Sequence, residues 1–145
     1  GTDVFYIIKI YSQKEQFSLL AVPLDSPLLQ LFIQQNQAEI ERINPNLAKE
    51  KADEAFLLLR NGLPAGFILG QIQQEKYRLL MDFVLSPYRD FKPGFFLHGD
   101  SSNPFVKRGF HEISAVSHQR EHQQYLKKVG FQQSDENPLV FAKQI

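Results

Sequence analysis

A β-hairpin at residues 55–74 constrains the fold of this chain more than any other feature. The segment AFLLLRNGLPAGFILGQIQQ holds two apolar runs separated by Asn61 and Gly62. Asn-Gly between apolar runs favours a tight two-residue turn, because both residues tolerate a positive φ. A third apolar run, YRLLMDFVL (Tyr77–Leu85), follows after a short polar turn. The sequence therefore predicts a meander of three consecutive strands.

Helices and further strands are predicted on both sides of this meander. Ser26 and Pro27 mark the start of a helix. This helix ends where Asn44 precedes Pro45, because the residue before proline avoids the helical region. The mixture of elements predicts an α/β (α+β) sandwich. The elements expected outside the meander are a strand at 17–22, a helix at 26–44, a helix ending near 101, a strand at 110–117, a helix at 119–130 closed by Gly130, and a strand at 138–144.

The composition excludes several classes of protein. The chain has 145 residues, which fits one domain. Lys+Arg and Asp+Glu both number 16, so the formal charge is zero, whereas a general nucleic-acid binder normally carries a basic excess. Because the chain has no cysteine, it forms no disulfide, thiolate metal site or Cys nucleophile. Its longest apolar runs are far below the ~18 residues that a membrane span needs.

The N-terminal segment DVFYIIKIYSQKEQF allows two interpretations. It is either a strand or helix that docks on the core, or the last turns of a membrane helix cut at its cytosolic end. The second interpretation has Tyr at the membrane interface and Lys9 and Lys14 just beyond it, as the positive-inside rule requires. We expect residues 1–16 to be a stub or linker and residues 17–145 to be the folded domain.

The stretch SPYRDFKPGFFLHG (Ser86–Gly99) is the best candidate for a binding loop. A strand that leads through a short loop into a helix directs free backbone N–H groups and a partial positive charge at one place. Arg89 and Lys92 would add full charges there, and Gly94 would let a ligand approach the backbone. The alternative is a solvated turn between two core elements.

The order of strand, PxYRxxxxG, helix, strand and a helix ending YLKKVGF resembles the GNAT N-acetyltransferase superfamily. In that family an R-x-x-G-x-G loop holds the pyrophosphate of acetyl-CoA. Arg89 matches its first position and Gly94 its last, whereas Lys92 stands at the middle glycine. The resemblance implies a twisted mixed sheet with helices on both faces. It also implies acetyl-CoA, or another acyl-CoA, as cosubstrate and direct acyl transfer to an amine, without a metal.

The resemblance also implies residues for catalysis and binding. The family's general acid is a Tyr at a position that Leu126 occupies here, so Tyr125, about 100° away around the helix, is the available candidate. Asp82 lies mid-strand among apolar neighbours, which raises a carboxyl pKa and suits a general base. Alternatively, Asp82 accepts hydrogen bonds from a turn or pairs with Arg89 or Arg78.

Strands 77–85 and 110–117 are expected to splay apart, as in the family, so that free backbone groups around Phe83–Leu85 and Ala115–Ser117 can pair with the pantetheine amides. The expected cosubstrate contacts are Phe83, Val84, Leu85, Arg89, Asp90, Phe91, Lys92, Gly94, Phe95 and Ser117.

Two other functions are compatible with the sequence. HQREH (His118–His122) matches the H-x-x-E-H zinc motif, whose two His would share one helix face and need a third ligand from elsewhere. A zinc hydrolase is therefore one alternative. The other is a non-catalytic domain that senses acyl-CoA or a nucleotide, or that acts as a scaffold. Lys92 and Leu126, at positions where the family has Gly and Tyr, favour this second alternative.

A further resemblance concerns the whole protein. KIYSQKEQF together with FVLSPYRDFKPG is similar to bacterial membrane proteins that carry a GNAT-like domain after several membrane helices. This implies a domain on the cytosolic face of the inner membrane, next to a membrane domain. The acceptor would then be a small amine or an envelope component, and an oligomer is compatible with an exposed N-terminal strand.

Overall fold

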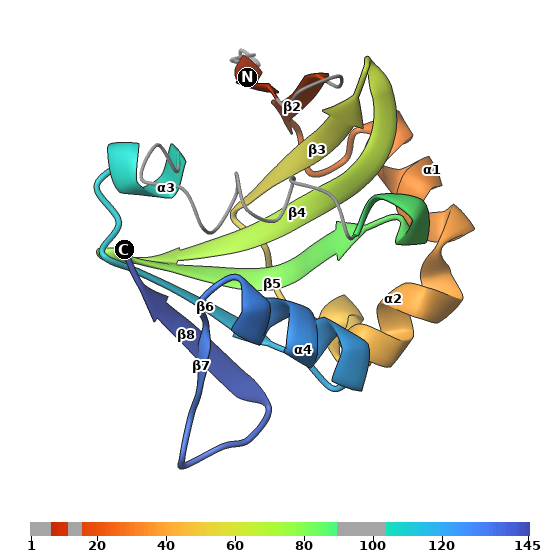
Figure 1. Cartoon of the computed structure of the whole chain (residues 1–145). Coiled ribbons are helices and arrows are strands. Elements are labelled where there is room, and N and C mark those ends of the chain that lie inside the picture. Colours follow the sequence, from red (N-terminus) through yellow and green to blue (C-terminus); the bar gives the residue numbers. More distant parts are fainter. Residues whose placement is uncertain (1–6, 12–15, 90–103) are drawn as a thin grey trace.

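The computed structural model describes residues 7–11, 16–89 and 104–145. In these ranges, eight strands form one mixed sheet in the order β1-β2-β3-β4-β5-β6-β8-β7 (Figure 1). This confirms the predicted mixed sheet. The strands are β1 Ile7–Tyr11, β2 Gln16–Val22, β3 Glu54–Arg60, β4 Leu63–Gln73, β5 Lys76–Val84, β6 Glu112–Val116, β7 Gln132–Gln133 and β8 Val140–Gln144; the helices are α1 Pro27–Gln35, α2 Gln37–Ile43, η1 Leu47–Lys49, η2 Ser86–Tyr88, α3 Pro104–Lys107 and α4 Arg120–Lys128.

The predicted meander is strands β3, β4 and β5, which pair in sequence as antiparallel neighbours. Asn61 and Gly62 form the β3–β4 turn with φ values of 49° and 84°. Two successive positive φ angles are the geometry that Asn-Gly supplies in a two-residue hairpin turn. The prediction from the Asn-Gly pair is therefore confirmed.

The N-terminal segment adds a strand to the edge of this sheet. β1 pairs antiparallel with β2, with Ile7 opposite Leu20 and Tyr11 opposite Gln16. The interpretation of residues 7–11 as helical turns is therefore wrong, and the strand interpretation is correct. Within the described ranges, the structure contains no helix with the length and apolar character needed to cross a membrane.

The helix expected at 26–44 is divided into α1 and α2. Its predicted start is confirmed, since the Ser26 hydroxyl accepts a hydrogen bond from the Leu29 amide. Asn36 separates the two helices with φ −118° and ψ 20°, and its side-chain amide donates to the Phe32 carbonyl at 2.8 Å. Asn side chains compete in this way for backbone groups inside helices, which accounts for the break that the apolar pattern did not predict.

Helices cover both faces of the sheet, as expected (Figure 1). On one face, α1 and α2 pack on β3, β4 and β5 through an apolar cluster that includes Phe32, Phe67 and Phe83. The ring centroids of Phe32 lie 6.0 Å and 6.1 Å from those of Phe67 and Phe83. On the other face, Phe105 of α3 and Leu126 of α4 belong to a second cluster. The helix expected to end near residue 101 lies outside the described residues.

A β-bulge separates β5 from its parallel neighbour β6. Their pairing runs from Lys76 opposite Glu112 to Leu79 opposite Ala115 and ends there, although β5 continues to Val84. The register between β5 and β4 shifts at the same place, so that Leu80 is an extra residue on β5. An extra residue bends and twists the bulged strand. The predicted splay of these two strands is confirmed, and the bulge is its local cause.

The C-terminal end of α4 is held by backbone and side-chain contacts. Gly130 has φ +104°, as its predicted role at the end of the helix requires. The Gly130 and Phe131 amides donate to the carbonyls of Lys127 and Leu126 at 3.1 Å and 2.9 Å. The Lys143 ammonium donates to the Val129 carbonyl at 2.8 Å, and burial lowers the pKa of Lys143. The predicted last strand is shorter than expected, and β7 was not predicted.

Candidate active site

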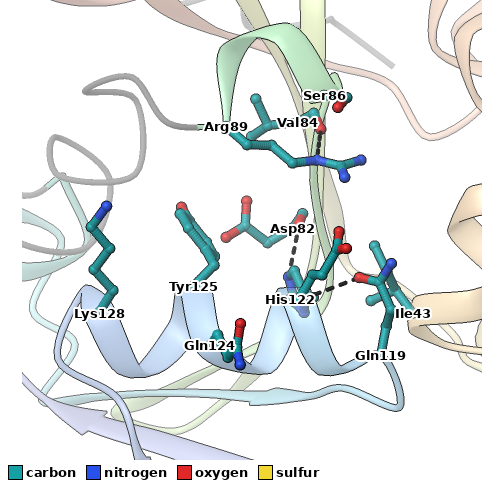
Figure 2. A pocket seen from close by; sticks show the side chains of 11 residues that line it. Ile43, Asp82, Val84, Ser86, Arg89, Gln119, His122, Gln124, Tyr125 and Lys128 are labelled. Carbon is teal, nitrogen blue, oxygen red and sulfur yellow. Dashed lines mark hydrogen bonds between the residues drawn. The ribbon is translucent and has the colours of Figure 1, made fainter.

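A pocket opens where β5 and β6 diverge (Figure 2). Its volume is about 370 Å³. The end of β5 and the turn η2 form one side, the C-terminus of α2 contributes a second, and α4 forms the third. The lining residues are Ile43, Asp82, Val84, Ser86, Arg89, Gln119, Glu121, His122, Gln124, Tyr125 and Lys128.

Asp82 and Tyr125, the two predicted catalytic residues, both line this pocket (Figure 2). Asp82 is 3% exposed. The Tyr125 side chain points from α4 toward the Asp82 carboxylate. Burial raises the pKa of Tyr125 well above its ordinary value, and the negative charge of Asp82 raises it further. The phenol therefore stays protonated at neutral pH next to an acidic side chain, which gives the pocket a hydrogen-bond donor and a proton acceptor.

The position of Tyr125 on α4 explains how it reaches the pocket. Leu126, the residue at the family position for the acid, is fully buried in the core cluster beside Phe131. His122, Tyr125 and Lys128 follow one another at intervals of three residues and all line the pocket. Residues at this spacing share one helix face. Tyr125 therefore belongs to the face of α4 that borders the pocket, and Leu126 to the core face.

The alternative role of Asp82, pairing with Arg78 or Arg89, receives no support from these arginines. Arg78 pairs with Glu50 at 3.4 Å, and Arg89 pairs with Glu39 at 2.7 Å. Each guanidinium thus has another carboxylate as its partner. The Asp82 carboxylate is directed instead toward Tyr125 on α4 (Figure 2).

Arg89 is held by contacts within the protein, and its role in phosphate binding stays a prediction. Its Nε donates to the Val84 carbonyl at 2.7 Å, while one terminal nitrogen pairs with Glu39 of α2. The guanidinium also lies 5.5 Å from the centroid of the Phe83 ring. Its charge is therefore partly compensated, and the side chain ties α2 to the end of β5. The other expected loop contacts, Asp90, Phe91, Lys92, Gly94 and Phe95, lie outside the described residues.

Several backbone groups at the divergence have partners within the protein, and their pairing with pantetheine stays a prediction. The carbonyls of Leu80, Asp82 and Val84 accept hydrogen bonds from the side chains of Asn44, His122 and Arg89, at 3.0, 3.2 and 2.7 Å. We call these three carbonyls the open edge of β5, because β6 no longer pairs there. The Leu85 amide donates to the Ala65 carbonyl and the Ser117 amide to the Leu139 carbonyl.

His122 connects the two diverging strands. Its Nδ1 lies 2.9 Å from the Ser117 hydroxyl, and its Nε2 lies 3.2 Å from the Asp82 carbonyl. Ser117 is fully buried just beyond the end of β6. The imidazole therefore occupies the gap between the strands, at a place where backbone pairing would otherwise continue.

Comparison with solved structures identifies the architecture. RimL, a ribosomal-protein acetyltransferase solved with coenzyme A, covers 95% of this chain and 98% of its own, with TM-score 0.68 and 10% identity. An acetyltransferase from Thermus thermophilus covers 88% and 97%, with TM-score 0.62 and 16% identity. Arabidopsis thaliana Naa50, solved with a CoA-containing bisubstrate analogue, covers 89% and 99%, with TM-score 0.60 and 21% identity. The chain has the GNAT fold.

No family model matches the sequence, and no curated protein matches it significantly. At these identities the structural likeness establishes the GNAT fold, which the order of sequence elements predicted. The function assigned to this chain depends on its own pocket.

The described residues do not form the helix-based zinc site that HQREH suggests. α4 begins at Arg120, so His118 precedes the helix and does not share a helix face with His122. Both ring nitrogens of His122 contact protein oxygens. Among the residues that the structure describes, no three His, Asp or Glu side chains gather as a metal site.

Sequence reasoning missed His122 and Asn44 as residues of the site. His122 was considered only as a zinc ligand, although it lies three positions before Tyr125 and thus on the same helix face. That spacing was the available signal. Asn44 contacts Leu80 across 36 positions of sequence, and no local pattern indicates such a contact.

Proposed function

We propose that this chain is an acyl-CoA-dependent N-acyltransferase that transfers an acetyl group to an amine. The observation that carries this proposal is the pocket between the diverging strands, in which buried Asp82 and half-buried Tyr125 lie together. The fold supports it, because solved structures that share this fold include RimL with coenzyme A and Naa50 with a bisubstrate analogue. Acetyl-CoA or another acyl-CoA is the proposed cosubstrate.

The proposed reaction is direct attack. The amine nitrogen forms a bond to the thioester carbonyl carbon, the carbon–sulfur bond breaks, and the sulfur leaves as a thiolate. Asp82, directly or through water, accepts the proton that the amine loses. The Tyr125 hydroxyl donates a hydrogen bond to the leaving sulfur. The chain has no cysteine that could form an acyl-enzyme, and the reaction requires no metal.

Release of free thiol from acetyl-CoA in the presence of an amine panel tests the proposal. The wild-type chain should release thiol with at least one amine, and Asp82→Asn should reduce kcat by about 100-fold or more. Asp135→Asn, an exposed Asp in the turn before β8, is the matched control and should keep the wild-type rate. An Asp82→Asn variant as active as wild type would remove Asp82 from the mechanism.

A non-catalytic acyl-CoA sensor is the second candidate function. It is favoured by Lys92 and Leu126, which stand at positions where the GNAT family has Gly and Tyr. Saturable binding of acetyl-CoA with no thiol release for any amine would select this function.

The acceptor we propose is an amine of a protein or a small molecule. The resemblance of the N-terminal segment to membrane proteins makes a membrane or envelope amine, at the cytosolic face of the inner membrane, our more specific proposal. The amine panel should therefore contain phosphatidylethanolamine vesicles beside soluble amines and peptides. Acetylation of soluble amines alone would contradict the envelope acceptor.

A further inference from the structure

In this chain, side chains donate hydrogen bonds to the three carbonyls at the open edge of β5. In a parallel sheet, β6 would supply N–H donors to carbonyls that face it. Beyond Leu79 it does not, and the carbonyls of Leu80, Asp82 and Val84 accept from three side chains instead. Buried carbonyls need such partners, because an unsatisfied one is costly. A ligand that donates hydrogen bonds to this edge therefore competes with side chains that already donate there.

His122 is the donor in the middle of this edge. A carbonyl only accepts, so the Nε2 atom that faces Asp82 carries the proton. In the neutral ring Nδ1 is then the acceptor, and the Ser117 hydroxyl donates to it at 2.9 Å. The hydroxyl has a second acceptor, the Gln119 carbonyl, at the longer distance of 3.3 Å. Ser117 therefore favours the tautomer in which the Nε2 of His122 donates to the Asp82 carbonyl.

We propose that His122 and Ser117 form a latch that closes the open edge of β5 and that must open when acyl-CoA binds. The inference rests on the proposed function. The pantetheine arm of acyl-CoA contains amide N–H groups, and an extended amide chain pairs with an exposed strand edge as an added strand. The arm and the His122 ring thus compete for the same Asp82 carbonyl. The latch lowers the apparent affinity for acyl-CoA, because only the open form binds.

The position of His122 makes this competition local. The ring lies on the pocket face of α4, with its centroid 5.9 Å from that of Tyr125. Asp82 contributes its carbonyl to the latch and its carboxylate to the pocket that Tyr125 lines. Opening of the latch therefore exposes the strand edge next to the proposed catalytic pair.

Calorimetric titration of the full chain with acetyl-CoA tests the latch. His122→Ala should bind about fivefold more tightly than wild type, equivalent to one hydrogen bond of about 1 kcal/mol. Ser117→Ala removes the hydroxyl that orients the His122 ring, so its affinity for acetyl-CoA should rise by less than that of His122→Ala. His118→Ala is the matched control, since His118 lies outside the pocket, and should bind like wild type. ADP, which lacks the pantetheine arm, should bind all variants equally.

The outcomes separate the latch from the proposed function. If wild type binds acetyl-CoA and both His122→Ala and Ser117→Ala bind it equally or more weakly, the latch is wrong and the proposed function stands. If His122→Ala gains as much affinity for ADP as for acetyl-CoA, the latch is also wrong, because the effect would not arise at the pantetheine amides. If His122→Ala binds acetyl-CoA and wild type does not, the result supports the latch. Absence of binding in wild type and in both variants overturns the latch and the proposed function together.

Discussion

At the scale of single residues, adjacent side chains on α4 have opposite environments. Leu126 is fully buried in the core, while its neighbour Tyr125 lines the pocket beside Asp82. Successive residues of a helix are about 100° apart, so one position decides which side chain faces the site. The resemblance to the GNAT family pointed to the position of Leu126, and the structure assigns the pocket to Tyr125.

Replacement of Tyr125 by Phe tests this assignment. The variant lacks the hydroxyl that would stabilise the leaving thiolate, so kcat should fall by about 100-fold, with little change in affinity for acetyl-CoA. Steady-state kinetics and a binding titration measure the two effects separately. Leu126→Met, a conservative change in the core, should leave kcat near the wild-type value. Equal kcat for Tyr125→Phe and wild type would exclude Tyr125 as a catalytic group.

The raised pKa of Tyr125 also predicts a pH dependence of stability. Burial and the Asp82 charge hold the folded-state pKa of Tyr125 above its ordinary value of 10.0. Above about pH 10 the unfolded chain loses this proton while the folded chain keeps it, so the free energy of unfolding decreases as pH rises. Chemical denaturation at pH 8 to 11 should show a smaller decrease for Tyr125→Phe. If the free energy of unfolding fell equally with pH for wild type and Tyr125→Phe, the buried environment assigned to the Tyr125 hydroxyl would be contradicted.

At the scale of secondary-structure elements, the bulge in β5 determines where the site forms. Asn44 stabilises this bulge from the end of α2, because it is 3% exposed and its amide donates to the Leu80 carbonyl. Its own side-chain oxygen accepts from the Asn46 amide at 3.1 Å. One side chain thus fixes the end of a helix and the point where two strands separate.

Asn44→Ala should therefore destabilise the protein. The Leu80 carbonyl would lose its partner inside the fold, at a cost of about 1–3 kcal/mol. Urea denaturation measures the change in the free energy of unfolding. Asn46→Ala removes an exposed side chain next to it and should change stability by less than about 0.5 kcal/mol. Equal stability of Asn44→Ala and wild type would show that Asn44 does not hold the bulge.

Substitution of Gly130 tests what holds the C-terminal end of α4. Its φ of +104° is strained for any residue with a Cβ, and an added Cβ would lie 3.2 Å from Lys143 Cε. Gly130→Ala should destabilise the protein by about 1–2 kcal/mol. Gly109→Ala, whose φ is +91° but whose Cβ would have open space, separates backbone strain from contact with Lys143. The thermal unfolding midpoint should fall further for Gly130→Ala than for Gly109→Ala.

The elements that were predicted best have local causes. Asn61-Gly62, Ser26-Pro27 and Gly130 each determine a turn or helix end through their own backbone preferences, and all three predictions are confirmed. The break at Asn36 was missed because its side-chain bond to Phe32 competes with a continuous apolar pattern. The occupied open edge of β5 was missed because its donors are distant in sequence: the bond from His122 to Asp82 spans 40 positions.

At the scale of the whole molecule, one ion pair ties a helical layer to the strand that carries the site. Arg89, at the end of η2, pairs with Glu39 of α2 at 2.7 Å, and both side chains are partly exposed. From the sequence, Arg89 is expected to add positive charge to the binding loop, and Arg89→Ala should therefore weaken the binding of acyl-CoA. The structure adds a positioning role, so this variant should also loosen the contact between α2 and β5.

The pocket, the GNAT fold and the pair Asp82 and Tyr125 together lead to one central claim, that this chain binds acyl-CoA between β5 and β6. Titration of the wild-type chain with acetyl-CoA tests it most directly. We predict saturable binding of one ligand per chain, at a concentration in the range of about 1 μM to 1 mM that is typical of enzyme substrates. An absence of binding at millimolar acetyl-CoA, by wild type and by His122→Ala, would contradict this claim.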